Sequence, residues 1–139
     1  MSQLNQTTNF YLNTYTNQSA VLNAIFYGQP GGLAVTDLAL ASLTMNIFTP
    51  TQGARSGVAK IAVIITSGYS LLPDVTQTQA ASVRQAGVEL FVVSEAPQPN
   101  LIEIDGIATP PISTHVFTLS GSGNVVTAST GLLDALCQK

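Results

Sequence analysis

Few side chains in this sequence could carry acid–base, nucleophilic or metal chemistry. His115 is the only histidine, and the only cysteine, Cys137, stands two residues before the end. A zinc site needs several nitrogen or sulfur ligands, so these two isolated residues do not predict one. A catalytic triad can be written from His115, Asp105 and any of many serines. Because serine is so abundant in this sequence, the match is not informative. The terminal position of Cys137 favours a structural or disulfide role over a nucleophilic one.

Acidic residues near predicted strand ends are the next candidates, and they are Glu89, Glu95, Glu103 and Asp105. Glu95 lies just past the carboxyl end of a predicted parallel strand, the edge at which open α/β sheets bind ligands. The competing interpretation is a carboxylate in a solvated loop, because position in a fold is weak support for function. The glycines between 28 and 32 lack the lysine of a phosphate loop, and no cofactor fingerprint or Gly-x-Ser-x-Gly elbow is present. We therefore expect no enzyme and no cofactor.

Length and composition indicate one domain over residues 1–139, with residues 1–9 as a loose polar segment. Apolar residues make up 45% of the chain and charged residues 8%, with a net charge of only -3, which argues against disorder. The basic residues are four and scattered, so nucleic acid is not an expected partner. The longest apolar run, 61–65, is too short to span a bilayer, and the polar N-terminus is no signal peptide.

Two apolar runs, 58–66 and 88–93, predict the centre of the fold. Residues 61–65 are an uninterrupted apolar run rich in β-branched residues, and 88–93 is apolar apart from Glu89. Such runs are typical of strands buried on both faces. A helix is predicted between them at 75–86, with Asp74 as its cap and Gly87 at its end. A strand, a helix and a strand with short joints form a βαβ unit, so we expect parallel strands.

Further elements are predicted around this unit. The helix beginning at 16–19 has Thr16 or Asn17 as its cap, and the mostly buried helix at 34–48 has Thr36 or Asp37. The remaining predictions are strands at 10–12 and 115–119, a short helix at 101–107, and a closing helix at 125–137 with Val126, Leu132, Leu133 and Leu136 facing inward.

In their order and spacing, these segments resemble a von Willebrand factor A domain over nearly the whole chain. The segments that look like its last three parallel strands are 60–68, 86–93 and 115–117. Upstream, 10–15 resembles the third strand of the family, and Gly31-Gly-Leu-Ala-Val-Thr-Asp-Leu-Ala-Leu40 resembles its Gly-Gly-Thr-x-Thr-Gly-x-Ala-Leu segment. The resemblance implies an α/β fold with an open, mostly parallel, Rossmann-like sheet of about four strands flanked by helices.

The same resemblance implies a cation site whose chemistry is missing. The family binds its divalent cation through an Asp-x-Ser-x-Ser motif, a Thr and an Asp, which supply the oxygen ligands that a hard cation requires. The motif is absent here, the Thr position falls on Ala34, and the Asp position falls on Ser67. A shifted alignment offers Thr36, Asp37 and Ser67 as weaker candidates, although helix capping and a turn explain these residues as well. We therefore expect a degenerate site with no bound metal.

The first strands of the family are also missing, and this leaves one edge of the sheet open. In the resembling fold, the strand at 60–66 would lose its neighbour on one side, which exposes unpaired backbone groups beside apolar side chains. Either the chain is a fragment of a longer protein, or the edge is covered by rearrangement or by another subunit.

By resemblance, the expected function is a non-enzymatic protein-binding or adhesion module that works without metal. It would be extracellular or matrix-associated, as part of a longer secreted protein, and a cell-surface or matrix protein would be its partner. The contact residues would lie in three loops: Gly31, Gly32, Thr36, Ser67, Gly68, Tyr69 and Glu95. In that setting, the sequons at Asn5 and Asn17 could carry glycans and Cys137 could form an intermolecular disulfide. The alternative is a structural subunit, or a fragment of a larger multidomain protein, whose exposed sheet edge pairs with another chain.

Overall fold

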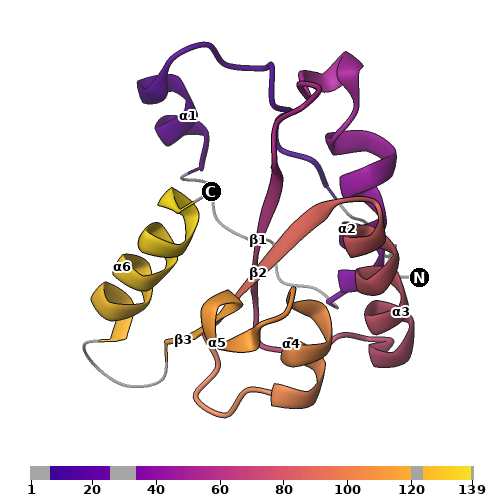
Figure 1. The fold of residues 1–139 in the computed structure, drawn as a ribbon, viewed down its shortest axis with the longest axis vertical. Helices are drawn as coiled ribbons and strands as arrows, with labels where there is room; N and C mark the ends of the chain where they lie inside the picture. The colour runs from indigo at the N-terminus through magenta and orange to yellow at the C-terminus, as the bar shows by residue number, and fades with distance from the viewer. Residues whose placement is uncertain (1–6, 26–33, 120–123, 139) are drawn as a thin grey trace.

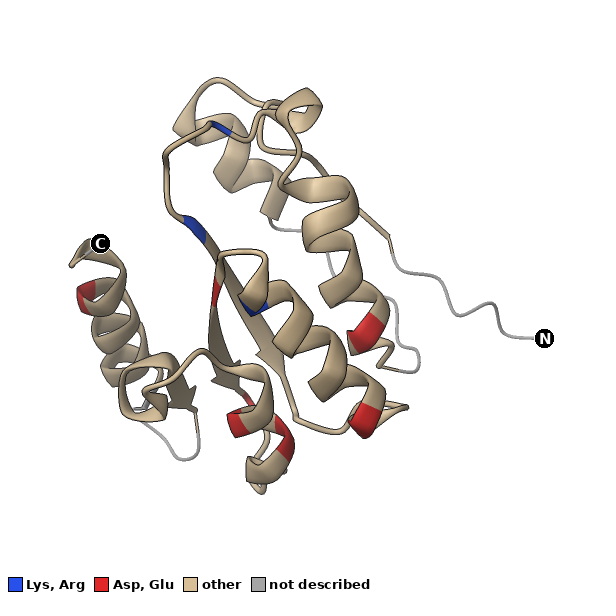
Figure 2. Ribbon diagram, turned by 45° about the vertical axis from the view of Figure 1, so that its right-hand side comes forward, with Lys and Arg blue, Asp and Glu red and all other residues tan. Residues whose placement is uncertain are grey.

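The computed structural model describes residues 7–25, 34–119 and 124–138. Within these ranges, three parallel strands form one sheet in the order β1-β2-β3: β1 (Lys60–Thr66), β2 (Val88–Ser94) and β3 (Val116–Thr118). Helices flank the sheet, with α2 and α3 on one side and α6 on the other (Figures 1 and 2). The expected α/β class with an open parallel sheet is confirmed, with three described strands rather than about four.

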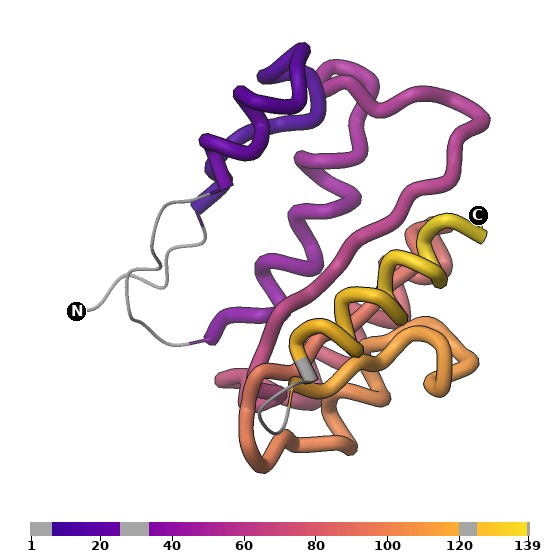
Figure 3. Tube along the Cα trace, turned by 90° about the vertical axis from the view of Figure 1, so that its left-hand side faces the viewer, coloured from indigo at the N-terminus to yellow at the C-terminus, as the bar shows by residue number. Residues whose placement is uncertain are grey.

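The helical elements connect these strands in the predicted sequence order. Their bounds are α1 (Gln18–Ile25), α2 (Thr36–Ser42), the π-helix η1 (Leu43–Ile47), the 3-10 helix η2 (Pro50–Gln52), α3 (Pro73–Gln85), α4 (Leu101–Ile107), α5 (Ile112–His115) and α6 (Asn124–Cys137). Figure 3 shows α1, in indigo, at the opposite end of the molecule from α4, in orange. Because β1 leads into α3 and β2 leads into α4, the loops before these two helices border the carboxyl ends of the strands.

The central strand β2 explains most of the core. Six of its seven residues are buried, and β1 pairs with it along its full length, from Lys60 beside Val88 to Thr66 beside Ser94. The core cluster on the α2–α3 side combines strand and helix residues: Leu40, Ala80, Val83, Val88, Leu90, Val92, Ile104, Ile107 and Ala108. Apart from Glu89, this mostly apolar segment is therefore buried on both faces of the sheet, as predicted.

The predicted strand at 10–12 is wrong. The backbone there makes local bonds instead: Tyr11 N–H donates to Thr14 Oγ1 at 2.9 Å, and Thr14 N–H donates to Tyr11 O at 3.1 Å. The Phe10 and Tyr15 rings meet edge to face, with centroids 5.5 Å apart. A turn that satisfies its own backbone groups needs no strand partner.

Two predicted caps are also wrong, and one is confirmed. Asn17 Oδ1 accepts the N–H of Ala20 at 2.9 Å, as an N-cap does. By contrast, α2 follows Val35 and α3 follows Leu72, and neither helix has a side-chain cap. Asp37 and Asp74 lie inside the first turns, where a carboxylate still interacts favourably with the helix dipole. The helix α3 begins earlier than predicted because Pro73 is pre-organised for a first helical position.

The inward face of α6 differs from the predicted one. Val126 and Leu133 are exposed, Leu132 and Leu136 are half-buried, and Ala128 is the buried residue. In addition, a Cβ on Gly131 would meet the Phe117 ring at 3.0 Å. The small residues therefore let α6 approach β3 closely, whereas Val126 and Leu133 face away from the core. The helix at 34–48 is likewise less buried than expected: Leu38 and Met45 are exposed, and α2 buries only Leu40 and Ser42.

Candidate functional site

Three segments meet at the carboxyl ends of the strands. They are 67–72 after β1, 95–100 after β2, and the residues that lead into α2. Leu71 N–H donates to Ala34 O at 2.9 Å, which joins the first segment to the third. Tyr69 Oη donates to Gln98 O at 3.1 Å, which joins the first segment to the second. The structure therefore brings the three predicted contact loops together, as far as they are described.

Gly68 sets the path of the loop after β1. Its φ is +77°, a left-handed conformation that glycine adopts without strain. A Cβ at this position would lie 2.9 Å from the Ile104 side chain and 3.0 Å from Asn100 O. Its N–H donates to Thr66 Oγ1 at 3.1 Å. The loop thus turns tightly against the start of α4, and it does so only because Gly68 has no side chain.

The buried carboxylate of Glu103 holds the same loop through hydrogen bonds. Glu103, in the first turn of α4, is only 1% exposed. Its Oε1 and Oε2 accept the Ser70 N–H at 3.1 Å and 3.3 Å. Thr76 Oγ1 donates to Ser70 Oγ at 3.0 Å, so α3 also holds Ser70. Glu103, not the exposed Glu95, is therefore the acidic residue with a structural part in this site.

The outer face of these segments is apolar. Ile102 is 81% exposed and Tyr69 is 60% exposed. The residues next to them in the chain, Glu103 and Gly68, are buried. We define the loop surface as five exposed apolar side chains from the segment 67–72 and the first turn of α4: Tyr69, Leu71, Leu72, Leu101 and Ile102. Large exposed apolar residues gathered at one end of a domain are typical of a protein-contact surface.

The other predicted site residues divide between described and undescribed parts of the chain. Thr36, Asp37 and Ser67 are half-buried, and Ala34 is exposed. Gly31, Gly32 and Asn5 lie outside the described residues. Asn17 is exposed while its side-chain oxygen caps α1, and Cys137 is a free, exposed thiol at the end of α6.

The side chains near the expected cation position do not fit a hard divalent cation. Ala34 has no side-chain oxygen, Ser67 offers a neutral hydroxyl, and Asp37 is the one carboxylate of the three candidates. Mg²⁺ prefers several oxygen ligands, with carboxylates to balance its charge. Within the ranges that the structure describes, no group of three or more His, Cys, Asp or Glu residues could hold a metal ion.

A second polar arrangement lies at the amino ends of β2 and β3 and was not predicted. His115 is buried and ends α5, and its Nε2 lies 2.7 Å from Glu89 Oε1. Its Nδ1 lies 3.0 Å from Pro111 O and 2.9 Å from Thr114 Oγ1. The ring stacks on Phe91, with centroids 4.4 Å apart. Every polar atom of the imidazole therefore has a partner, which is typical of a structural histidine.

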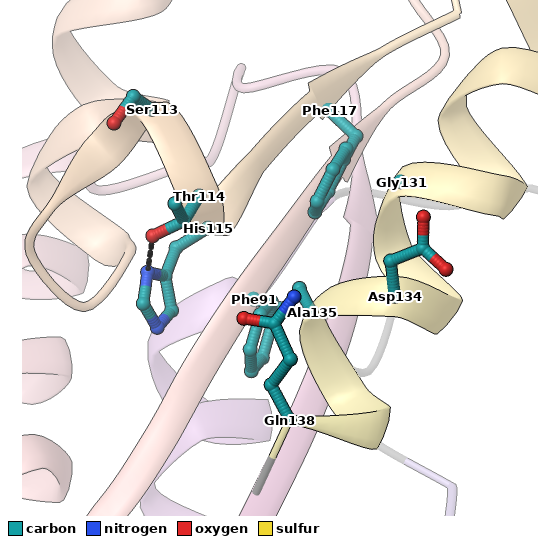
Figure 4. Close-up of a pocket in the computed structure, with 9 residues that line it drawn as sticks. All are labelled: Phe91, Ser113, Thr114, His115, Phe117, Gly131, Asp134, Ala135 and Gln138. Carbon is teal, nitrogen blue, oxygen red and sulfur yellow. Dashed lines mark hydrogen bonds between the residues drawn. The ribbon is translucent and has the colours of Figure 1, made fainter.

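A pocket of roughly 310 Å³ lies beside this histidine, between α6 and the α5–β3 segment (Figure 4). Its lining residues are Phe91, Ser113, Thr114, His115, Phe117, Gly131, Asp134, Ala135 and Gln138. None of the predicted contact residues is among them. The pocket is thus separate from the loop surface, and its lining mixes aromatic rings with polar groups from α6.

No helix in the described part of the chain is both long enough and apolar enough to cross a membrane.

Comparison with known proteins gives the family. The model of the von Willebrand factor type A domain matches residues 2–130. Bovine von Willebrand factor A domain-containing protein 1 is 34% identical over 110 residues, which are 78% of this chain and 26% of that protein. Chicken integrin alpha-1 is 30% identical over 131 residues, which are 85% of this chain and 45% of that protein. The chain thus spans less than half the length of these relatives.

The solved structures agree on the fold. Proximal thread matrix protein 1 from the mussel byssus, with a zinc-occupied MIDAS motif, superposes with a TM-score of 0.82 at 23% identity, over 94% of this chain and 33% of that one. Manganese-loaded TRAP protein of Plasmodium vivax gives a TM-score of 0.57 at 16% identity, over 73% of this chain and 41% of that one. With the family model matched over residues 2–130, the chain belongs to the von Willebrand factor type A domain family.

Proposed function

We propose that the chain is a non-enzymatic protein-binding module that makes its contact through the loop surface and without a metal ion. The observation that carries this proposal is the apolar outer face of the loops, led by Tyr69 and Ile102. Exposed aromatic and aliphatic side chains on well-held segments are what a protein contact uses. Relatives such as integrin alpha-1 and chicken matrilin-3 support an adhesive role at the level of the family.

The chemistry of the loops supports contact without a cation. A cation-dependent module offers carboxylates and hydroxyls around the ion, and an acidic group of the partner completes the coordination. In the resemblance drawn from the sequence, the Thr and Asp ligand positions of the family fall on Ala34 and Ser67. The half-buried carboxylate of Asp37 sits in the first turn of α2, where the helix dipole already stabilises it. Burial of apolar surface therefore replaces coordination as the source of affinity.

The proposed setting is extracellular, within a longer secreted protein. Matrilin-1 and vitrin, both similar to this chain, suggest a matrix context. Two features fit it: Asn17 is exposed within a sequon, and Cys137 is exposed and free to bridge to another chain. In the same setting, the sequon at Asn5 would be a second candidate for glycosylation.

Binding to an immobilised extract of extracellular matrix tests this function. We expect the purified chain to bind equally well in Mg²⁺ and in chelator. Ile102→Asp should weaken binding by roughly tenfold or more, because a charge would replace apolar contact surface at the centre of the interface. Val126→Asp is the matched control, since Val126 is 72% exposed but lies on α6. Binding that disappears in chelator and returns with Mg²⁺ would refute the metal-free proposal.

A second candidate function rests on a different observation: among the described residues, no strand pairs with the second side of β1. Here the chain is a structural subunit, or part of a larger protein, and its sheet continues into another chain. The exposed side chains Val63 and Ile65 on that strand favour this candidate.

A further inference from the structure

The acidic residues of the chain are distributed unevenly over the fold. Glu89 lies near the amino end of β2, and Asp134 lies on α6. The other acidic residues lie at the carboxyl ends of the strands or in the helices that begin there: Asp37, Asp74, Glu95, Glu103 and Asp105. Figure 2 shows most of the acidic positions, in red, toward the lower end of the molecule. The end of the fold that carries the loop surface is therefore the acidic end.

The basic residues lie elsewhere. Lys60 is the first residue of β1 and Arg55 precedes it, so both lie toward the amino end of that strand. Arg84 is in the last turn of α3, and its Nη1 donates to Gly106 O at 2.8 Å and to Ile107 O at 2.6 Å, at the far end of α4. The segments that form the loop surface, 67–72 and 95–105, contain no lysine or arginine. No basic side chain within them therefore balances their carboxylates.

On α4, the acidic and apolar residues share one face. Asp105 follows Ile102 by three positions and Leu101 by four, and residues at these spacings are neighbours on a helix surface. The side chains of all three are exposed. A partner that covers the apolar side chains of α4 would therefore also meet the carboxylate of Asp105.

Two further exposed carboxylates border the loop surface on its other segments. Asp74, in the first turn of α3, follows the exposed Leu72 by two residues. Glu95 begins the segment that Tyr69 contacts through Gln98 O, at 3.1 Å. The loop surface is thus an apolar patch with carboxylates on each of its segments.

The helix dipoles at this end are too weak to reverse its charge. The helices α2, α3 and α4 begin here, and each N-terminus is equivalent to roughly +0.5 charge, or about +1.5 in all. Five carboxylates oppose this positive charge: Asp37, Asp74, Glu95, Glu103 and Asp105. The net charge around the apolar side chains is therefore negative.

We propose that the partner of the loop surface is basic: a protein segment whose aliphatic or aromatic side chains cover Tyr69 and Ile102 and whose lysine or arginine side chains flank them. The inference rests on the proposed function, because it names the partner of the same surface. The carboxylates do not form a site of their own. The apolar side chains supply the contact area, and the carboxylates favour a partner of opposite charge and disfavour an acidic one.

The size of the electrostatic effect decides which measurement reveals it. One exposed ion pair changes affinity only by roughly twofold to fivefold. Several charges of one sign around a contact surface act more strongly on the rate of association, and salt screens that effect beyond about 8–10 Å. The basic partner should therefore be recognised by its association rate and by the salt dependence of that rate.

Two synthetic peptides test the sign of the charge against the full chain, immobilised for surface plasmon resonance. In both peptides leucine alternates with a charged residue, which is lysine in one and glutamate in the other. We expect the lysine peptide to bind at least about tenfold more tightly at roughly 50 mM salt. Its association rate should fall at least about fivefold at roughly 500 mM salt, where the Debye length is less than half as long.

Matched variants locate the binding. Asp105→Asn should weaken binding of the lysine peptide by roughly twofold to fivefold. Asp134→Asn is the control: it changes the net charge equally, but its exposed carboxylate lies on α6, and it should leave binding unchanged. Ile102→Ser removes apolar contact without changing the charge, and it should weaken binding by about tenfold or more.

This set of results would support the proposal, and three others would overturn it. Equal binding of the two peptides, or tighter binding of the glutamate peptide, contradicts a basic partner. Equal losses in Asp105→Asn and Asp134→Asn would show that net charge, and not the loop surface, attracts the peptide. Self-association of the chain at about 100 µM that Lys60→Gln abolishes would make a second copy the occupant.

Binding to the matrix extract separates this inference from the function on which it rests. If binding to the extract requires Ile102 but is insensitive to salt and to Asp105→Asn, the proposed function stands and only the basic partner is refuted. If Ile102→Ser leaves binding to both the extract and the lysine peptide unchanged, the loop surface is not the contact site, and both proposals fail.

Discussion

Glu103 and Ser70 are 33 residues apart in sequence, yet the buried carboxylate of Glu103 accepts the backbone N–H of Ser70 with both oxygens, at 3.1 Å and 3.3 Å. This contact joins α4, which follows β2, to the loop that follows β1. It holds the segment that carries Tyr69 and Leu71, two members of the loop surface. The shape of the proposed contact surface therefore depends on a carboxylate that no partner would touch.

Glu103→Ala should destabilise the protein by about 1–3 kcal/mol, because it leaves the Ser70 N–H without its partner in a buried position. Glu103→Gln keeps one acceptor oxygen and should cost less. Asp105→Ala is the control, since Asp105 is an exposed carboxylate on the same helix. Urea unfolding measures all three variants. Equal stability of the Glu103→Ala and Asp105→Ala variants would contradict a structural role for Glu103.

Gly68→Ala should be more harmful than the same change at Gly57. Both glycines have a positive φ, +77° and +73°, so each substitution carries the strain of a left-handed residue, roughly 1–2 kcal/mol. Only at Gly68 would the new Cβ also meet other atoms, at 2.9 Å from Ile104 and 3.0 Å from Asn100 O, whereas Gly57 has nothing within 4 Å. The difference between the two unfolding free energies therefore isolates the steric clash.

If the loop after β1 cannot pack against the start of α4, the chain should also bind the matrix extract more weakly. We expect Gly68→Ala to weaken attachment to the matrix extract more than Gly57→Ala does. Similar losses in stability and in binding for the two variants would mean that Gly68 is needed for its φ alone and not for close approach.

The sequence predicted the elements that are defined by local pattern. The strands at 58–66 and 88–93 follow from their apolar runs, and the short helix at 101–107 lies between the turn residues on either side of it. The structure confirms all three with small shifts of their ends. The family resemblance, confirmed by the match over residues 2–130, supplied the order of the strands.

The sequence did not predict features that depend on contacts between distant segments of the chain. The burial of Glu103 could not be predicted from the sequence, because it depends on which loop packs over the carboxylate, whereas Glu95 is exposed. The segment 10–12 has strand-forming residues but no strand beside it, so its backbone closes a local turn instead. On α6, Val126 and Leu133 are apolar yet exposed, because Ala128 and Gly131 provide the close contact. Hydrophobic periodicity indicates an apolar face but does not say how closely the neighbouring element approaches.

His115→Ala should destabilise the protein by about 2–3 kcal/mol. The change removes a ring stacked on Phe91 and the 2.7 Å contact with Glu89, and it opens a cavity in a buried position. Glu89→Gln should have a smaller effect, since its amide oxygen can still accept from Nε2 and its carboxyl group is partly exposed. Thermal unfolding compares the two. A larger loss in the Glu89→Gln variant would show that charge, rather than packing and hydrogen bonding, dominates this contact.

For Ser94 we predict the opposite effect on stability: removing its hydroxyl should not lower the free energy of unfolding. Its side chain is fully buried at the carboxyl end of β2, and within the described residues its Oγ has no hydrogen-bond partner. A buried hydroxyl without a partner costs free energy, so Ser94→Ala should leave the protein as stable as before, or raise the unfolding free energy by up to about 1 kcal/mol. Thr76→Val is the matched contrast: Thr76 is equally buried, but its Oγ1 donates to Ser70 Oγ, and its loss should destabilise by about 1 kcal/mol. Urea unfolding of both variants measures the difference. If Ser94→Ala were the more damaging change, the Ser94 hydroxyl would have a partner in solution, and the carboxyl end of β2 would be a wetter, more open part of the site than the structure indicates.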